Sequence, residues 1–265
     1  MLNEIPILIK TTHSDSKLIE RLRWFCQQPG CNWTLSQSGA ESSELNITRR
    51  GVFLTNGTEQ LAFHPSMALI RLINLLRGGS DRFLEATQLQ IGDSLIDATL
   101  GLGTDALIGA WAVGDKGRVL AIEQSPILAA MVQDGLNHFQ ELITDAKNAD
   151  KQEAWAALAQ AAQQIEVHWG EHRNFLSRIP SNSVDVVYFD PMFRHTRKQS
   201  DSIQPLHQWS DHSPLQPKAV LEACRIARQR VVLKERKNSS EFSRLGFEIL
   251  LGGRYSPVDY GIIFI

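Results

Sequence analysis

Residues 97–105 read Asp97-Ala98-Thr99-Leu100-Gly101-Leu102-Gly103-Thr104-Asp105, between an apolar strand pattern at 94–98 and a helical pattern at 104–112. Glycine has no Cβ atom, so the two glycines let the backbone approach a ligand closely. Open α/β sheets bind their ligands at such loops, beyond the carboxyl ends of parallel strands. The stretch therefore predicts the first strand, loop and helix of a wound parallel sheet.

The rest of the chain from residue 91 continues this alternation of strands and helices. We expect strands at 117–123, 165–169, 184–189 and 231–234, with a helix at 126–139. The almost wholly apolar run 184–189 is typical of a central strand buried on both faces. Residues 247–251 and 260–265 predict a terminal antiparallel pair, and the Ala- and Gln-rich segment 145–163 predicts an inserted surface helix.

The first 63 residues predict a small separate α+β domain. Strand patterns lie at 5–9, 45–48, 51–55 and 60–63, and a helix follows Ser14. The dipeptide Asn56-Gly57 is a strong hairpin signal. Residues 64–90 then predict bridging helices, starting at His64-Pro65, and residues 91–265 form the wound domain.

Bulk composition indicates a soluble globular chain. Its 265 residues are 43% hydrophobic and 21% charged, which excludes collagen, coiled coil and a disordered tail. Three cysteines are too few for a disulfide framework, and no spacing predicts a metal site. The start lacks a leader pattern and no window is apolar enough for a membrane span, so we expect a cytoplasmic protein without membrane or metal.

Charge is unevenly distributed along the chain. The formal net charge of −2 argues at first against a nucleic-acid partner. However, residues 194–254 hold 12 basic and 6 acidic residues, a local +6, which leaves −8 for the rest. The average therefore does not exclude RNA.

Two carboxylates indicate the kind of cofactor. Asp97 ends the first strand, and Ala106 stands where a dinucleotide fingerprint has its third glycine. An acid there repels a pyrophosphate and suits a cation, while Glu123, about 20 residues beyond the glycines, can accept both ribose hydroxyls. This pattern favours S-adenosylmethionine over NAD. The plainer alternative is a capping Asp97, a tight turn and a solvated Glu123.

The third strand ends at Trp169-Gly170-Glu171-His172. Glu171 can accept from an adenine amino group, with Trp169 or His172 beside the ring. A helix N-cap role for Glu171 fits equally well.

The fourth strand runs into Asp190-Pro191-Met192-Phe193. Methyl transfer to an exocyclic amine needs acceptors for the amino hydrogens, here the Asp190 side chain and a backbone carbonyl near Pro191. Phe193 would stack on the base and fix its plane. The alternative is an ordinary strand-ending Asp-Pro turn.

These motifs resemble class I S-adenosylmethionine-dependent methyltransferases with a Rossmann-like sheet. Within that class, residues 91–237 are similar to the RsmJ family of small-subunit ribosomal RNA guanine-N2 methyltransferases. The resemblance rests on the 97–105 stretch, Glu123, the 188–193 loop and Val231-Val232-Leu233-Lys234. It implies that the cofactor is bound by Asp97, Gly101, Gly103, Thr104, Asp105, Glu123, Gln124, Gly170, Glu171 and Asp190.

The chain departs from the family at three positions. Thr104 and Gln124 stand where the family has arginine, and Arg194 stands where it has proline. Residues 1–63 and 140–164 also look unlike the RsmJ proteins.

Two basic clusters follow the last strands and predict a phosphate-binding rim around the pocket. They consist of Arg194, Arg197 and Lys198 after the catalytic loop, and of Lys234, Arg236 and Lys237 after the next strand. A merely solvated charged loop is the alternative. The long connection 205–217 resembles a lid. His64 and Arg71 are either surface residues or neighbours of the pocket.

Together these features predict a methyltransferase with Asp190, Pro191 and Phe193 as catalytic residues. Its substrate would be an exocyclic amine of an RNA base, foremost guanine N2 of ribosomal RNA or of the small ribosomal subunit. The alternatives are adenine N6 in DNA or RNA, a small molecule or protein, and a non-catalytic RNA-binding protein.

Overall fold

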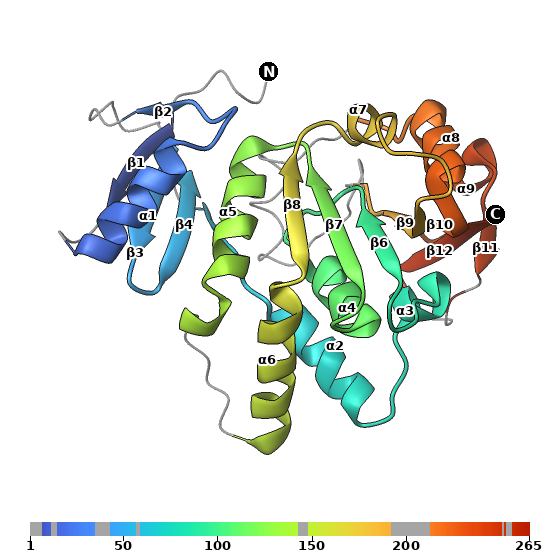
Figure 1. The fold of residues 1–265 in the computed structure, drawn as a ribbon, viewed down its shortest axis with the longest axis horizontal. Coiled ribbons are helices and arrows are strands. Elements are labelled where there is room, and N and C mark those ends of the chain that lie inside the picture. The colour runs from blue at the N-terminus through green and yellow to red at the C-terminus, as the bar shows by residue number, and fades with distance from the viewer. Residues whose placement is uncertain are drawn as a thin grey trace.

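Two β-sheets organise the part of the chain that the computed structural model describes (Figure 1). The described residues are 7–11, 15–34, 43–56, 59–142, 148–191, 213–250, 252 and 256–265. The larger sheet has seven strands in the order β11-β12-β10-β9-β6-β7-β8. The strands are β6 (Ser94–Asp97), β7 (Arg118–Glu123), β8 (Ile165–Trp169), β9 (Val184–Phe189), β10 (Ala227–Arg236), β11 (Glu248–Leu250) and β12 (Val258–Phe264).

Strand directions confirm the expected Rossmann-like class. Strands β10, β9, β6, β7 and β8 run parallel, and β12 runs antiparallel to both β10 and β11. Because β6 leads to β7 on one side and pairs with β9 on the other, the strand order reverses between β6 and β9. Open α/β sheets bind ligands at this reversal.

Helices cover both faces of the large sheet (Figure 1). Alternate residues of β9 point to opposite faces, so Val186 and Tyr188 enter one core and Val187 and Phe189 the other. The first core is closed by α2 (Ser66–Leu76), α3 (Arg82–Thr87), α4 (Thr104–Val113) and α6 (Ala149–Ala162). The second is closed by α7 (His172–Leu176), α8 (Pro217–Ile226) and α9 (Glu241–Leu245).

Helix α6 differs from the expected surface helix at 145–163. Its residues Ala154, Leu158, Ala161 and Ala162 are buried in the first core. They recur at helical spacing and form one apolar face, which packs against α2 and α4. The segment is therefore part of the core, and the surface assignment was wrong for this face.

Sequence reasoning missed helix α8. Pro217 begins the helix, and Val220, Ala223 and Ile226 lie on its buried face. The proposed lid at 205–217 falls mostly outside the described residues, which resume at 213.

The smaller sheet lies against α5 (Pro126–Asn137), which the 3₁₀ turn η1 (Phe139–Glu141) follows (Figure 1). Its order is β2-β1-β3-β4-β5, with α1 (Ser16–Cys26) packed on it. The strands are β1 (Ile7–Thr11), β2 (Trp33–Thr34), β3 (Glu44–Thr48), β4 (Gly51–Asn56) and β5 (Glu59–Ala62). Their apolar residues share a core with Ile127 and Met131 of α5. Strand β1 is described from Ile7 and continues to Thr11, beyond the expected end at residue 9, while residues 5 and 6 lie outside the described residues. Asp15 caps α1.

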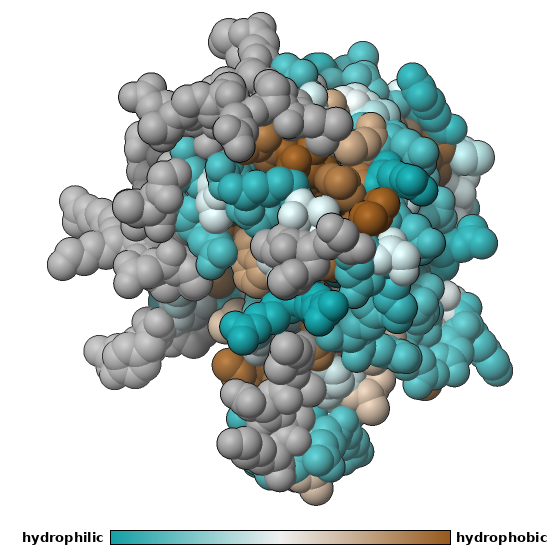
Figure 2. Space-filling model, turned by 90° about the vertical axis from the view of Figure 1, so that its left-hand side faces the viewer, coloured by the Kyte–Doolittle hydropathy of each residue, from teal (hydrophilic) through white to brown (hydrophobic). Residues whose placement is uncertain are grey.

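The side of the molecule that carries this small sheet is largely hydrophilic among the coloured atoms of Figure 2, around a smaller hydrophobic patch. Within the described ranges, no helix is both long and apolar enough to cross a membrane.

Candidate active site

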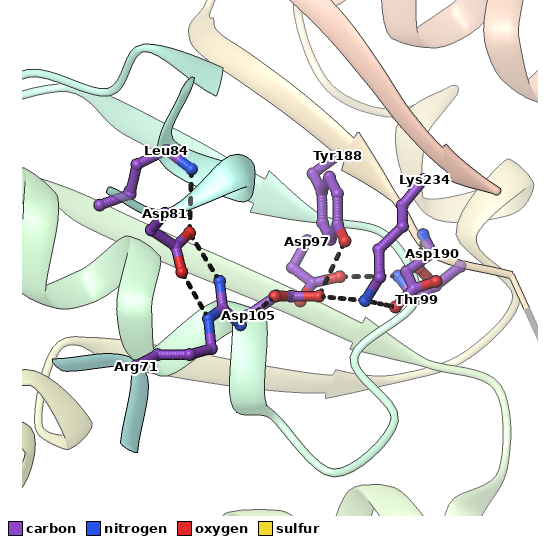
Figure 3. A network of polar contacts seen from close by, with 9 residues as sticks. All are labelled: Arg71, Asp81, Leu84, Asp97, Thr99, Asp105, Tyr188, Asp190 and Lys234. Atoms are coloured by element: carbon purple, nitrogen blue, oxygen red, sulfur yellow. Dashed lines mark hydrogen bonds and ion pairs between the residues drawn. The ribbon is translucent and has the colours of Figure 1, made fainter. Parts of the chain in front are cut away.

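Asp97 ends β6 and Asp190 follows β9, the two paired strands between which the strand order reverses (Figure 3). Asp97 is buried, and its Oδ1 accepts a hydrogen bond from the Thr99 amide at 3.1 Å. The Thr99 hydroxyl accepts in turn from the Asp190 amide at 2.6 Å. Thr99 therefore ties the loop after β6 to the loop after β9.

The glycine loop between β6 and α4 has the shape that its sequence predicts. Gly101 and Gly103 have φ of 54° and 77°, a left-handed conformation that favours glycine. The Gly101 amide donates to Glu123 Oε2 at 2.9 Å, and the Ser125 amide donates to Glu123 Oε1 at 2.8 Å. Glu123, at the end of β7, is thus fixed beside the loop.

The end of β8 adjoins Glu123 as well. The Gly170 amide donates to the Glu123 carbonyl at 2.9 Å, and the Trp169 indole donates to the Gln124 carbonyl at 3.1 Å. Glu171 occupies the N-cap position of α7, and its carboxylate contacts Arg173 at 2.7 Å. The structure thus brings this third strand end to the same sheet edge.

Asp105, in the first turn of α4, accepts from three side chains (Figure 3). Arg71 Nη1 donates to Oδ1 at 2.5 Å, whereas the Tyr188 hydroxyl and Lys234 Nζ donate to Oδ2 at 2.8 and 3.1 Å. Lys234 Nζ also donates to Asp190 Oδ2 at 2.6 Å. A continuous chain of ion pairs therefore joins α2 to the loop after β9.

The basic residues expected at the rim of the pocket differ in how exposed they are and in whether the structure describes them. Lys234 was expected to hold phosphate, but its side chain is 21% exposed and lies between two carboxylates. Arg236 is exposed and Lys237 half-buried at the end of β10. The other expected rim residues and the stacking aromatic lie outside the described residues: Arg194, Arg197, Lys198 and Phe193. Pro191 is described and half-buried.

Burial and charge set the protonation of these groups. Burial and the nearby Asp105 raise the pKa of Asp97 well above its usual value. Burial also raises the pKa of Asp190, against the charge of Lys234. Burial acts in the same direction on Asp105, but the cations Lys234 and Arg71 lower its pKa below the usual value. The carboxylates thus differ, with Asp105 held ionised and Asp97 favouring its neutral form.

The sequence left open whether Arg71 neighbours the pocket, and it gave Thr99 and Tyr188 no role in the site. Arg71 is the single charged residue in the apolar helix α2, which was a usable signal. Tyr188 lies within the apolar strand β9, where nothing in the pattern marks its hydroxyl. Within the described ranges, no group of three or more His, Cys, Asp or Glu side chains could hold a metal ion.

Comparison with known proteins identifies the family. Residues 82–246 match the family model described as "Putative SAM-dependent methyltransferase". The chain belongs to this methyltransferase family. Uncharacterized protein YpiP of Bacillus subtilis is 37% identical over 76% of this chain and 73% of its own length. Ribosomal RNA small subunit methyltransferase J of Alteromonas mediterranea is 25% identical over 91% of this chain and 90% of its own.

A solved structure shows the same fold. The SAM-dependent methyltransferase NGO1261 from Neisseria gonorrhoeae has a TM-score of 0.61 at 19% identity, covering 98% of this chain and 95% of its own. The alignment with the Alteromonas mediterranea protein spans 91% of the chain and so extends beyond residues 91–237. The expected difference from the RsmJ proteins at residues 1–63 and 140–164 stays a prediction.

The methyltransferase uses S-adenosylmethionine as its cofactor. The residues present fit it. A sulfonium and an ammonium group suit an acidic edge, and Asp97 offers a buried carboxylate that no cation among the described residues contacts. A Cβ atom on left-handed Gly101 would have only the Thr99 carbonyl oxygen near it, at 4.0 Å, whereas one on Gly103 would lie 3.3 Å from Val132 Cγ1 inside the protein.

Proposed function

We propose that this methyltransferase methylates an exocyclic amine of small-subunit ribosomal RNA, at guanine N2. The geometry of Asp190 carries the proposal. Its Oδ2 is held by Lys234, and no hydrogen bond from the described residues reaches its Oδ1. One carboxylate oxygen is thus left to accept from a substrate amine. The alignment with a ribosomal RNA small subunit methyltransferase J over 91% of the chain supports the choice of RNA.

When bound, S-adenosylmethionine supplies an electrophilic methyl group and leaves as a neutral thioether. The protein then has to orient the amine, because positioning alone provides effective molarities of up to about 10⁵–10⁸ M. Asp190 would accept a hydrogen bond from the amino group, orient the nitrogen lone pair toward the methyl carbon, and take the proton that the methylated nitrogen loses. Phe193 and the carbonyl near Pro191 hold the base in plane.

We assign the remaining site residues by their places along the edge. Asp97 faces the cofactor ammonium group, Glu123 the ribose hydroxyls and Glu171 the adenine amino group. Five further residues complete the cofactor site: Gly101, Gly103, Thr104, Gln124 and Gly170. Phosphates of the RNA are held by Arg194, Arg197, Lys198, Arg236 and Lys237. Residues 1–63 form a domain of their own, 64–90 the bridge and 91–265 the methyltransferase domain.

Transfer of label from tritiated S-adenosylmethionine to the RNA of a deletion strain tests the substrate. We expect label at guanine N2 of small-subunit RNA with the wild-type protein. Asp190→Ala should abolish transfer while cofactor binding, measured by calorimetry, persists. Label at adenine N6, in DNA, or only in small molecules or protein would refute the guanine assignment. Cofactor binding without any transfer would indicate a sensor.

A further inference from the structure

The ion pairs around Asp105 form a defined path from the bridging helix to Asp190. Arg71 of α2 forks onto Asp81, with Nε–Oδ2 at 2.7 Å and Nη2–Oδ1 at 2.9 Å, and reaches Asp105 with Nη1. Asp105 then contacts Lys234, and Lys234 contacts Asp190. Figure 3 shows these side chains in one row between α2 and β10.

We infer that Lys234 and Arg71 are positioning residues for the reaction, with Lys234 fixing the carboxylate of Asp190 and Arg71 fixing Lys234 through Asp105. This inference rests on the proposed function, because it gives Asp190 the role of accepting from the substrate amine. It differs from the role that the sequence predicts for Lys234, a contact to RNA phosphate.

Two hydrogen bonds fix the orientation of the Asp190 side chain. Lys234 Nζ lies 2.6 Å from Asp190 Oδ2, and the Thr99 hydroxyl holds the Asp190 amide. The side chain is therefore fixed at one oxygen and at its backbone. Oδ1 is the acceptor that remains for a substrate, since no described residue donates to it. A side chain held at its backbone amide and at one carboxylate oxygen presents the other oxygen in one direction.

The balance of charges along the path is the second reason why Lys234 keeps Asp190 a good hydrogen-bond acceptor. Asp81, Asp105 and Asp190 carry three negative charges when ionised, and Arg71 and Lys234 carry two positive ones. One negative charge is left on the path as a whole. Without Lys234, the buried Asp190 would favour its neutral form, which accepts hydrogen bonds less well.

Packing keeps the path rigid. The Arg71 guanidinium lies over the Phe83 ring at 5.7 Å, and this ring meets Tyr188 edge-on at 4.8 Å. Phe83 and Tyr188 are fully buried. Because Tyr188 also donates to the Asp105 oxygen that Lys234 contacts, Asp105 has little freedom to rotate. Arg71 therefore positions Lys234 indirectly, through the carboxylate of Asp105, which cannot rotate out of contact.

Several other titratable groups act on Asp190 and Lys234. They are Asp97 on β6, Asp105 on α4, Arg71 on α2, Tyr188 on β9, Glu235 on β10 and Tyr260 on β12. The tyrosines stay neutral at ordinary pH, since burial raises the pKa of each. Lys234 stays charged, because Asp105 and Asp190 raise its pKa despite burial. Asp190 is thus the carboxylate of this path whose pKa is raised, and the one expected to respond when the charge of Lys234 is removed.

The test compares Lys234→Met and Lys234→Arg with wild type. We expect Lys234→Met to lower kcat about 10²-fold, the low end for a positioned proton acceptor. KM for RNA and the salt dependence of binding should not change. The acidic limb of the kcat profile should move up by about one to three pH units, and Lys234→Arg should restore part of the activity.

Arg71→Met should move the acidic limb of the kcat profile in the same direction as Lys234→Met, but by a smaller amount. Arg77→Met, at the residue that directly follows α2, is the matched control. Its pair with Asp150 is exposed, so this variant should leave the profile unchanged.

A phosphate contact gives a different result. Lys234→Met would then raise KM and reduce the salt slope by about 0.7, with the pH profile unmoved, and this outcome would overturn the inference. Titration of the Asp190 carboxyl carbon by ¹³C NMR, with no RNA present, keeps the two proposals separate. A midpoint that rises in Lys234→Met supports the inference even if ribosomal RNA is not methylated, and an unchanged midpoint refutes it.

Discussion

Phe63 occupies the space that a side chain on Gly135 would need. A Cβ atom at Gly135 would lie 2.2 Å from Phe63 Cδ1, and one at Gly103 would lie 4.0 Å from Phe63 Cε2. Phe63 follows β5 directly, whereas Gly135 belongs to α5. The small sheet, α5 and the cofactor loop therefore meet at one ring.

Gly135→Ala should destabilise the protein by about 1–3 kcal/mol, because overpacking forces the ring or the helix to shift. Denaturant unfolding measures this loss, with Gln133→Ala on the same helix as the control. Adding Phe63→Leu should recover part of the loss. A Gly135→Ala protein as stable as the control would show that the ring moves freely.

Arg21 and Asp134 form a buried ion pair between α1 and α5. Arg21 Nε lies 2.6 Å from Asp134 Oδ1, Nη2 contacts the other oxygen, and the Asp134 side chain is 2% exposed. Arg21→Met leaves this carboxylate without its main partner, so we expect a loss of about 3–5 kcal/mol. Arg23→Met, at an exposed residue of the same helix, is the control.

His138 should make the Arg21→Met loss depend on pH. Its hydrogen bond to Asp134 raises the pKa of the imidazole. A group whose pKa is raised by folding stabilises the fold fully when the pH lies below the ordinary pKa of that group. This stabilisation is lost as the pH rises through the pKa of the folded state. The stability that Arg21→Met loses should therefore be smaller at about pH 5.5, where His138 is charged, than at about pH 8.5. Equal losses at both would exclude compensation by His138.

Asp97→Asn should change the pH dependence of stability in the cofactor-free protein. Burial raises the pKa of Asp97, so wild type loses stability as the pH rises through that value, and the amide removes this loss. The Tm of the variant should exceed that of wild type toward neutral pH. Added S-adenosylmethionine should raise the Tm of wild type more than that of the variant, and a reversed order would contradict the proposed contact.

Thr99→Val should slow the reaction, because it removes the acceptor of the Asp190 amide. A buried donor left unpaired costs about 1–3 kcal/mol. We expect a lower Tm and a kcat reduced about tenfold, with Thr99→Ser close to wild type in both. Single-turnover transfer separates this effect from product release. A Thr99→Val enzyme with full kcat would show that Asp190 is positioned by its side chain alone.

Local properties of the sequence determined the alternation of strands and helices along the chain and the cofactor loop. Left-handed φ angles at Gly101 and Gly103 follow from the missing Cβ, and the apolar run 184–189 requires burial on both faces. The backbone conformation of the two glycines and the burial of this strand each depend only on residues that are close in the sequence. The ends of β6, β7 and β9 then follow from the parallel arrangement, so the acids at one edge were predictable.

Only the tertiary structure decided which charges pair. Lys234 and Asp105 are 129 residues apart, and Arg71 and Asp105 are 34 apart on different helices. No periodicity records such contacts, and a lysine after a strand looks the same whether it faces RNA or a carboxylate. The pairing arises because β10 lies beside β9 and α2 packs on α4, which buries these groups together. Buried charges must then neutralise one another, and this requirement gave Lys234 its partners.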